Sequence, residues 1–145
     1  MATIREILAK KGTQVFTIGK GATVLDAALL MNEHRIGALV VTDEGRVVGM
    51  FTERDVLRRV VGERRDPAET PVADVMTMEV LCCTLETTLE EVRGVMKNRR
   101  IRHLPVVDGD HRLEGLVSIG DLNAHEATSQ EQTIYLLHEY LYGRV

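Results

Sequence analysis

Apolar residues recur along this chain at helical spacing in some stretches and as short runs in others, and these patterns predict its elements. Thr23 is a favourable N-cap for the first long helical stripe, and Asp43, Glu44 and Gly45 form a turn between two apolar runs. In order, the first half of the chain predicts a strand over 14–18, a helix over 24–31, strands over 38–41 and 47–51, and a helix over 56–61.

The second half predicts the same order: a strand over 80–83, a helix over 89–96, strands over 104–107 and 113–117, and a helix that begins at Ser118. Outside the repeat, we expect a short helix over 3–10, ended by Gly12, and an amphipathic helix with Ile134, Leu137 and Leu141 on one face. The helices of each unit can cover only one face of a small sheet, so two units should pack sheet to sheet. The predicted fold class is α/β (α+β), with the unit β-α-β-β-α present twice.

A heptapeptide marks each passage from strand to helix. Gly49–Asp55 and Gly115–Asp121 both read glycine, two apolar residues, a hydroxyl residue, two variable residues and aspartate. The preceding stretches match as well, because residues 23–43 align with residues 88–108 at an offset of 65. A duplicated supersecondary unit is first a statement about architecture. Two copies of one hydroxyl and carboxylate pair also predict two related ligand sites.

The pairs Thr52/Asp55 and Ser118/Asp121 are each spaced by three residues at a helix start, and this spacing has two interpretations. In a capping box, the hydroxyl accepts a hydrogen bond from the third backbone N–H and the acid accepts one from the N–H of the cap. In a ligand site, the same carboxylate accepts two hydrogen bonds from the vicinal diol of a ribose. Repetition alone does not separate these interpretations, because a duplicated cap would repeat too.

Basic residues end the two matching helices: His34 and Arg35 in the first half, Arg99 and Arg100 in the second. Cations at a helix C-terminus are favourable by about 0.3–1 kcal/mol without any ligand. At symmetric positions facing one cleft they would also bind phosphate oxygens, which arginine does bidentately. A diol acceptor together with phosphate-binding cations describes a nucleotide site.

The segments 99–108 and 115–121 resemble the signatures of the CBS domain, named after cystathionine β-synthase, and residues 23–57 and 88–122 together resemble a CBS pair. The resemblance implies tandem repeats packed by pseudo-twofold symmetry, with two clefts that bind AMP, ADP, ATP, NAD(H) or S-adenosylmethionine. It also implies a division of the chain into repeat 1 (11–62), a linker (63–71), repeat 2 (72–127) and a C-terminal helix (128–145).

The same resemblance implies which residues form the nucleotide sites. For the ribose they are Thr52, Arg54, Asp55, Ser118, Gly120 and Asp121; for the adenine, Thr13, Gln14, Ile36, Gly37, Met78, Glu79, Ile101 and Arg102; for the phosphates, His34, Arg35, Arg99 and Arg100. Gly37 and Arg102 hold matching positions, so the two pockets should be unequal. Val40 stands where the second repeat has Pro105.

Composition narrows the function classes. The 145 residues carry a net charge of −4, which argues against a general nucleic-acid role, and no apolar run approaches the roughly 18 residues needed to span a bilayer. The first residues do not form a signal peptide, so we expect a cytoplasmic protein. The histidines show no metal-binding spacing. The adjacent Cys82 and Cys83 leave a redox role open beside the simpler interpretation as packed apolar residues.

We therefore predict a homodimeric CBS pair that binds an adenine nucleotide, holds no metal, does not insert in a membrane and regulates an unidentified protein. Catalysis is not expected, because no set of acid, base and nucleophile is visible. Two other functions remain open. One is a structural or adaptor pair with empty clefts that acts through protein contacts, and the other is a nucleotide-dependent enzyme or redox protein that uses Cys82 and Cys83.

Overall fold

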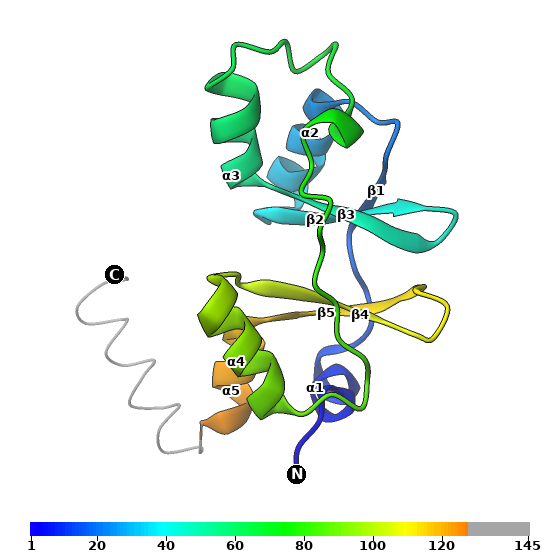
Figure 1. The fold of residues 1–145 in the computed structure, drawn as a ribbon, viewed down its shortest axis with the longest axis vertical. Coiled ribbons are helices and arrows are strands. Elements are labelled where there is room, and N and C mark those ends of the chain that lie inside the picture. The colour runs from blue at the N-terminus through cyan, green and yellow to red at the C-terminus, as the bar shows by residue number, and fades with distance from the viewer. Residues whose placement is uncertain (128–145) are drawn as a thin grey trace, which may run out of the picture.

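The computed structural model describes residues 1–127, and the predicted C-terminal helix over 128–145 lies outside the described residues. Two repeats follow each other along the chain (Figure 1). The first contains β1 (Thr17–Gly19), α2 (Val24–His34), β2 (Ala38–Asp43), β3 (Arg46–Thr52), α3 (Glu53–Asp55) and the π-helix η1 (Val56–Val61). The second contains α4 (Leu89–Arg99), β4 (His103–Val107), β5 (Leu113–Ser118) and α5 (Ile119–Glu126). Each repeat is preceded by a short helical segment, α1 (Ile4–Lys11) or the 3-10 helix η2 (Val72–Asp74).

The two sheets differ by one strand. In the first, β1 runs parallel to β2, which pairs antiparallel with β3, whereas the second holds only the antiparallel pair β4 and β5. The predicted strand over 80–83 is wrong, because this segment makes a single bridge, from Cys83 to Val106. The next bond of that parallel ladder would need an N–H at Pro105, which proline lacks. Val40 holds the matching position in the first repeat, and its N–H donates to the carbonyl of Phe16 at 3.4 Å.

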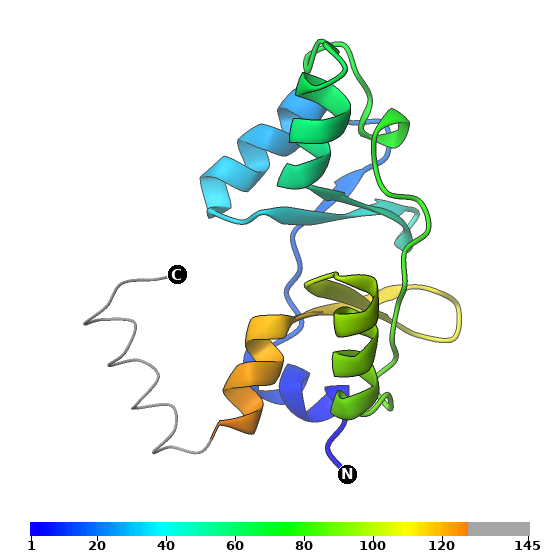
Figure 2. The same cartoon turned by 60° about the vertical axis from the view of Figure 1, so that its left-hand side comes forward.

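The two sheets face each other and the helices cover their outer faces, as Figures 1 and 2 show. The predicted sheet-to-sheet packing is therefore confirmed. The buried residues between the sheets are Ala38, Val40, Val47, Met50 and Val107. At one end the two hairpins are joined directly, because the N–H of Val47 donates to the carbonyl of His111 at 3.2 Å. At the opposite end, where β3 and β5 finish, the helices α3 and α5 begin.

The segment that precedes each repeat packs against the other repeat. Ile4, Ile7 and Leu8 of α1 are buried in the core of the second repeat. In the same way, the core of the first repeat includes three residues that follow the linker, Val72, Val75 and Met76. Backbone bridges repeat this exchange, since Thr3 pairs with Thr88 and Pro71 with Thr23. We call these two segments, residues 2–11 and 71–77, the exchanged arms; each repeat needs one of them to close its core.

The glycine of each heptapeptide makes room for an exchanged arm. A Cβ atom at Gly49 would lie 2.5 Å from the Sδ of Met76, and one at Gly115 would lie 2.7 Å from a Cδ of Leu8. Both distances are far inside van der Waals contact, so with any larger residue the side chain of Met76 or Leu8 would have to move. The repeated glycine is therefore a packing requirement, shared by both repeats.

Candidate functional site

Both predicted capping boxes are formed. At the start of α3, the Oδ2 of Asp55 accepts from the N–H of Thr52 at 3.0 Å, and the hydroxyl of Thr52 accepts from the N–H of Asp55 at 3.3 Å. At the start of α5, the corresponding distances between Ser118 and Asp121 are 2.8 and 3.2 Å. In each case the cap uses Oδ2, so the ligand interpretation depends on what surrounds the other oxygen.

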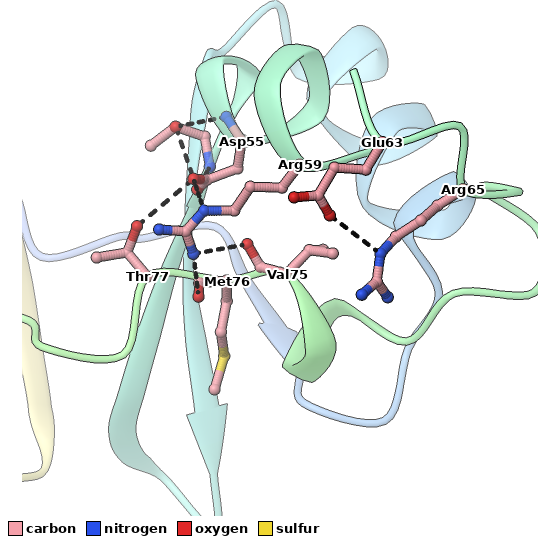
Figure 3. A network of polar contacts seen from close by, with 8 residues as sticks. Asp55, Arg59, Glu63, Arg65, Val75, Met76 and Thr77 are labelled. Carbon is pink, nitrogen blue, oxygen red and sulfur yellow. Dashed lines mark hydrogen bonds and ion pairs between the residues drawn. The ribbon is translucent and has the colours of Figure 1, made fainter. Parts of the chain in front are cut away.

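The surroundings of Asp55 come from η1 and from the exchanged arm (Figure 3). The Oδ1 of Asp55 lies 3.5 Å from the hydroxyl of Thr77 and 3.8 Å from the Nε of Arg59. Arg59 is fixed in turn, since its Nη1 donates to the carbonyl of Met76 at 2.9 Å. The Asp55 side chain is only 9% exposed. We call Thr52, Asp55, Arg59 and Thr77 the first site.

The surroundings of Asp121 are more open and include a direct ion pair. The Nζ of Lys11, at the end of α1, lies 2.6 Å from the Oδ2 of Asp121, whose side chain is 22% exposed. Beside this pair is a hollow of about 290 Å³ between α1 and α5, lined by Ile7, Lys10, Lys11, Asp121, Ala124 and His125. That volume is near the lower limit of roughly 300 Å³ for small-molecule pockets. We call Lys11, His103, Ser118 and Asp121 the second site.

His103, at the start of β4, is half-buried beside this ion pair. Burial lowers the pKa of its imidazole, and the positive charges of Lys11 and Arg102 lower it further, while Asp121 acts in the opposite direction. His103 therefore favours its neutral form, in which one ring nitrogen donates and the other accepts a hydrogen bond.

The backbone brings two of the predicted adenine residues to the helix starts. The N–H of Glu53 donates to the carbonyl of Gly37 at 3.0 Å, and the N–H of Ile119 donates to the carbonyl of Arg102 at 2.9 Å. Ile36 and Ile101 adjoin them in the chain. Thr13, Gln14, Met78 and Glu79 are exposed in the segments that connect the exchanged arms to the sheets. The carboxylate of Glu53 lies over Gly37, about 3.2 Å from where a Cβ would be. The first repeat thus has an acid beside Gly37, whereas the second has a cation at the matching Arg102, so these positions differ in charge as well as in size.

The predicted phosphate residues are exposed at the ends of α2 and α4. Arg35 and Arg100 both have left-handed backbones, with φ of 54° and 55°, at the C-caps of their helices. Glycine is favoured at such a cap, and other residues there usually carry strain. His34 stacks on Phe16 with ring centroids 3.9 Å apart. None of the side chains of Arg35, Arg54, Arg99, Arg100 and Arg102 forms an ion pair within residues 1–127.

Comparison with known proteins identifies the family. A sequence model of the CBS domain matches residues 4–62 and 72–127. The chain belongs to the CBS-domain family. A putative signal-transduction protein with CBS domains from Burkholderia ambifaria has 39% sequence identity, and its structure superposes with a TM-score of 0.82 over 89% of this chain and 96% of that one.

Two other solved CBS structures were determined with small ligands. Hypoxic response protein I of Mycobacterium tuberculosis, with two coordinated zinc ions, is 30% identical, with a TM-score of 0.76 over 86% of this chain and 99% of that one. The CBS domain pair of protein MJ0100, in complex with 5′-methylthioadenosine and S-adenosyl-L-methionine, is 23% identical, with a TM-score of 0.75 over 86% and 95%. Its likeness to this CBS pair is one of fold.

Neither a reactive thiol nor a metal cluster is found in the part of the CBS pair that the structure describes. Burial raises the pKa of Cys82, and raises that of Cys83 to about 12. Thiols in this environment are poor nucleophiles, because the thiolate is the reactive form. Within residues 1–127 no group of three or more His, Cys, Asp or Glu side chains could hold a metal ion. No helix in that range is both long and apolar enough to cross a bilayer.

Sequence reasoning missed four residues that surround the two carboxylates: Lys11, Arg59, Thr77 and His103. Thr77 and Lys11 come from the exchanged arms, so their positions depend on a packing that the repeat pattern does not reveal. A signal was present in the arms themselves, because Ile4, Ile7 and Leu8 have the same spacing as Val72, Val75 and Met76.

Proposed function

We propose that this CBS pair binds adenine nucleotides through Asp55 and Asp121 and acts as a non-catalytic, ligand-sensing regulatory module. The observation that carries the proposal is that each repeat has both a helix-start carboxylate and an arginine in a left-handed cap. These are Asp55 and Arg35 in the first repeat and Asp121 and Arg100 in the second. The carboxylate suits a ribose diol. The arginines, without an acidic partner in residues 1–127, suit phosphate oxygens.

Two further observations support this proposal. MJ0100 binds two adenosine-containing ligands on the same fold. The strain at Arg35 and Arg100 would be relieved by glycine, and a residue kept in a strained backbone points to function. Among residues 1–127, the surroundings of both carboxylates contain no paired nucleophile and base, so we expect binding to shift a conformational equilibrium without chemistry. The half-buried Cys82 and the buried Cys83, both free thiols, suit a reducing compartment, in line with the cytoplasmic location that we propose.

The test is titration calorimetry with AMP, ATP, NAD(H) and adenosine, backed by native mass spectrometry of protein purified without added nucleotide. Asp55→Ala and Asp121→Ala should each remove one binding event, at a cost of about 1.5–3 kcal/mol for a charged hydrogen-bond acceptor. Asp26→Ala is the matched control, because Asp26 forms the same capping box with Thr23 but belongs to neither site. If the double variant at positions 55 and 121 gives the same titrations as the wild type, the proposed nucleotide sites are wrong and the adaptor function is the remaining alternative.

We also propose that the pair is a homodimer formed through the helices of the first repeat. Exposed large apolar side chains gather there, Leu25 and Leu29 on α2 and Leu57 and Val61 on η1. The aligned positions of the second repeat are Glu90, Gly94, Asn123 and Ala127. Large exposed apolar patches mark interaction surfaces, and within residues 1–127 the helices of the second repeat have polar or small residues at these aligned positions.

Sedimentation at micromolar concentration tests this dimer. Leu29→Glu should give a monomer, because a charge would be buried without a partner in the interface. Gly94→Glu, at the aligned position of the second repeat, should remain a dimer. A wild-type monomer, with and without nucleotide, would refute the proposal.

A further inference from the structure

The two repeats satisfy the same pair of acceptors with different groups from their exchanged arms. In the first repeat, Thr77 donates its N–H to the carbonyl of Met50 at 2.9 Å, and its hydroxyl lies 3.5 Å from the Oδ1 of Asp55. The aligned acceptors of the second repeat are the carbonyl of Leu116 and the carboxylate of Asp121. Here the Nζ of Lys11 donates to both, at 2.8 and 2.6 Å. One ammonium group thus replaces a backbone N–H and a hydroxyl.

The difference arises from the length of the arms. The bridge residues Thr3 and Pro71 hold equivalent places, since each pairs with the N-cap of the other repeat's first helix, Thr88 or Thr23. Thr3 precedes Thr23 by 20 residues, whereas Pro71 precedes Thr88 by 17. The three extra residues lengthen α1 beyond Leu8 and end it at Lys11. The cation at Asp121 is therefore built into the backbone of the first arm.

The replacement of the Thr77 groups by the Lys11 ammonium group changes the hydrogen bonding of the acid that faces the ligand. A hydroxyl can rotate, and it can donate or accept a hydrogen bond, so a ribose hydroxyl can replace the Thr77 hydroxyl at Oδ1 of Asp55. An ammonium group only donates and carries a charge. In the second site, Oδ2 of Asp121 already accepts from both the N–H of Ser118 and Lys11. Within residues 1–127, Oδ1 of Asp121 has no hydrogen-bond partner.

The residues four positions after the two acids, Arg59 and His125, do not remove this difference between the two sites. Arg59 lies 3.8 Å from Asp55, beyond hydrogen-bond distance, and its guanidinium group is held by the carbonyls of Val75 and Met76. His125, its counterpart in α5, lies 3.7 Å from Glu6 of α1. Among the described residues, Asp55 thus has a long ion pair with Arg59, whereas Asp121 has a cation within hydrogen-bond distance.

We propose that Lys11 determines the ligand affinity of the second site. A ribose diol that binds both oxygens of Asp121 displaces the ammonium group from Oδ2, so the second site binds the same nucleoside more weakly than the first. This inference rests on the proposed nucleotide binding.

The test uses adenosine, which carries the diol but no phosphate, in an Asp55→Ala background that leaves only the second site. Lys11→Met should strengthen adenosine binding roughly fivefold, the range expected when a partly exposed ion pair no longer competes. Lys11→Arg keeps the cation and should retain the weak binding. Lys97→Met removes an exposed lysine of α4 that lies outside this hollow and makes no ion pair within residues 1–127, and it should have no effect. Raising the salt concentration should strengthen adenosine binding when Lys11 is present but not in Lys11→Met, because salt screens the competing pair.

Each outcome separates this inference from the proposed function. If adenosine binds and Lys11→Met leaves its affinity unchanged or lowers it, Lys11 does not compete with the diol and the inference is wrong, while nucleotide binding stands. If only the first site binds, and Lys11→Met does not create binding at the second, the inference is also wrong. If neither site of the wild type binds any adenine nucleotide, the proposed function fails and this inference fails with it.

Discussion

The two repeats keep the same backbone around their carboxylates but surround them with different side chains. In both, the first N–H of the helix donates to the carbonyl of the residue before the first hairpin strand, at 3.0 Å for Gly37 before β2 and 2.9 Å for Arg102 before β4. In the first repeat the acid is nearly buried beside a hydroxyl, and in the second it is more exposed and paired with Lys11. Caps, strand glycines and exchanged arms thus preserve the scaffold, while the side chains around each acid set the affinity of each site separately.

The largest effects should come from the exchanged arms, because their apolar residues close both cores. Leu8→Ala and Met76→Ala should each lower the free energy of unfolding by about 2–5 kcal/mol, the usual cost of a truncated core residue. Denaturant unfolding measures this cost, and Lys10→Ala, on the exposed side of α1, is the control. A loss below about 1 kcal/mol for both arms would show that they are not part of the cores.

Contact between each arm and its strand glycine can be isolated by a double-mutant cycle. Gly115→Ala alone should cost about 1–3 kcal/mol, because its Cβ would overlap Leu8. In the Leu8→Ala background, the same change should cost much less, since the overlapping atoms are gone. Gly94→Ala is the matched control: Gly94 lies in α4 with no atom near its Cβ position, and alanine should stabilise the helix there by roughly 0.5–1 kcal/mol.

Most of the fold follows from the repeat in the sequence, and the exceptions have local causes. Periodicity predicts the hairpins, the helices and the sheet-to-sheet packing, because each repeat must bury one face of a small sheet. The strand over 80–83 fails at Pro105, where one missing N–H ends the ladder. The exchange of arms is not visible in the repeat, because it depends on which core each short helix fills.

The two carboxylates could be predicted as candidate site residues, but not their different environments. Asp55 and Asp121 stand out because they end a repeated heptapeptide. Lys11 does not, since it belongs to a three-residue extension that has no counterpart in the second arm. The capping interpretation and the ligand interpretation are also compatible in the structure, since each cap uses one oxygen of the acid, Oδ2, and a carboxylate oxygen can accept more than one hydrogen bond.

A smaller effect should distinguish charge from strain at the helix caps. Arg35→Ala and Arg35→Gly both remove the proposed phosphate contact, and each should weaken AMP binding more than adenosine binding. Only alanine keeps the cost of a left-handed backbone, so the glycine variant should be more stable by about 0.5–1 kcal/mol. Arg100→Ala and Arg100→Gly should behave alike in the second repeat. Equal stability of the alanine and glycine variants would contradict the strain argument, and equal affinities for adenosine and AMP in the wild type would contradict the phosphate contact.

The smallest effect concerns the one histidine that distinguishes the second site. The first repeat has Ala38 where the second has His103. Burial, and then the charge of Lys11, lower the pKa of His103 below its usual 6.5, so the unfolded chain takes up a proton at higher pH than the folded protein does. Its contribution to stability is therefore complete above about pH 6.5 and is lost as the pH falls through the lowered pKa. His103→Ala, which copies the first repeat, should make the free energy of unfolding fall less steeply from about pH 7 to pH 5. Urea titrations across this range measure the wild type and the variant. A slope that is unchanged in His103→Ala would mean that His103 titrates in the folded protein as it does in the unfolded chain, and that the ion pair of Lys11 and Asp121 does not influence it.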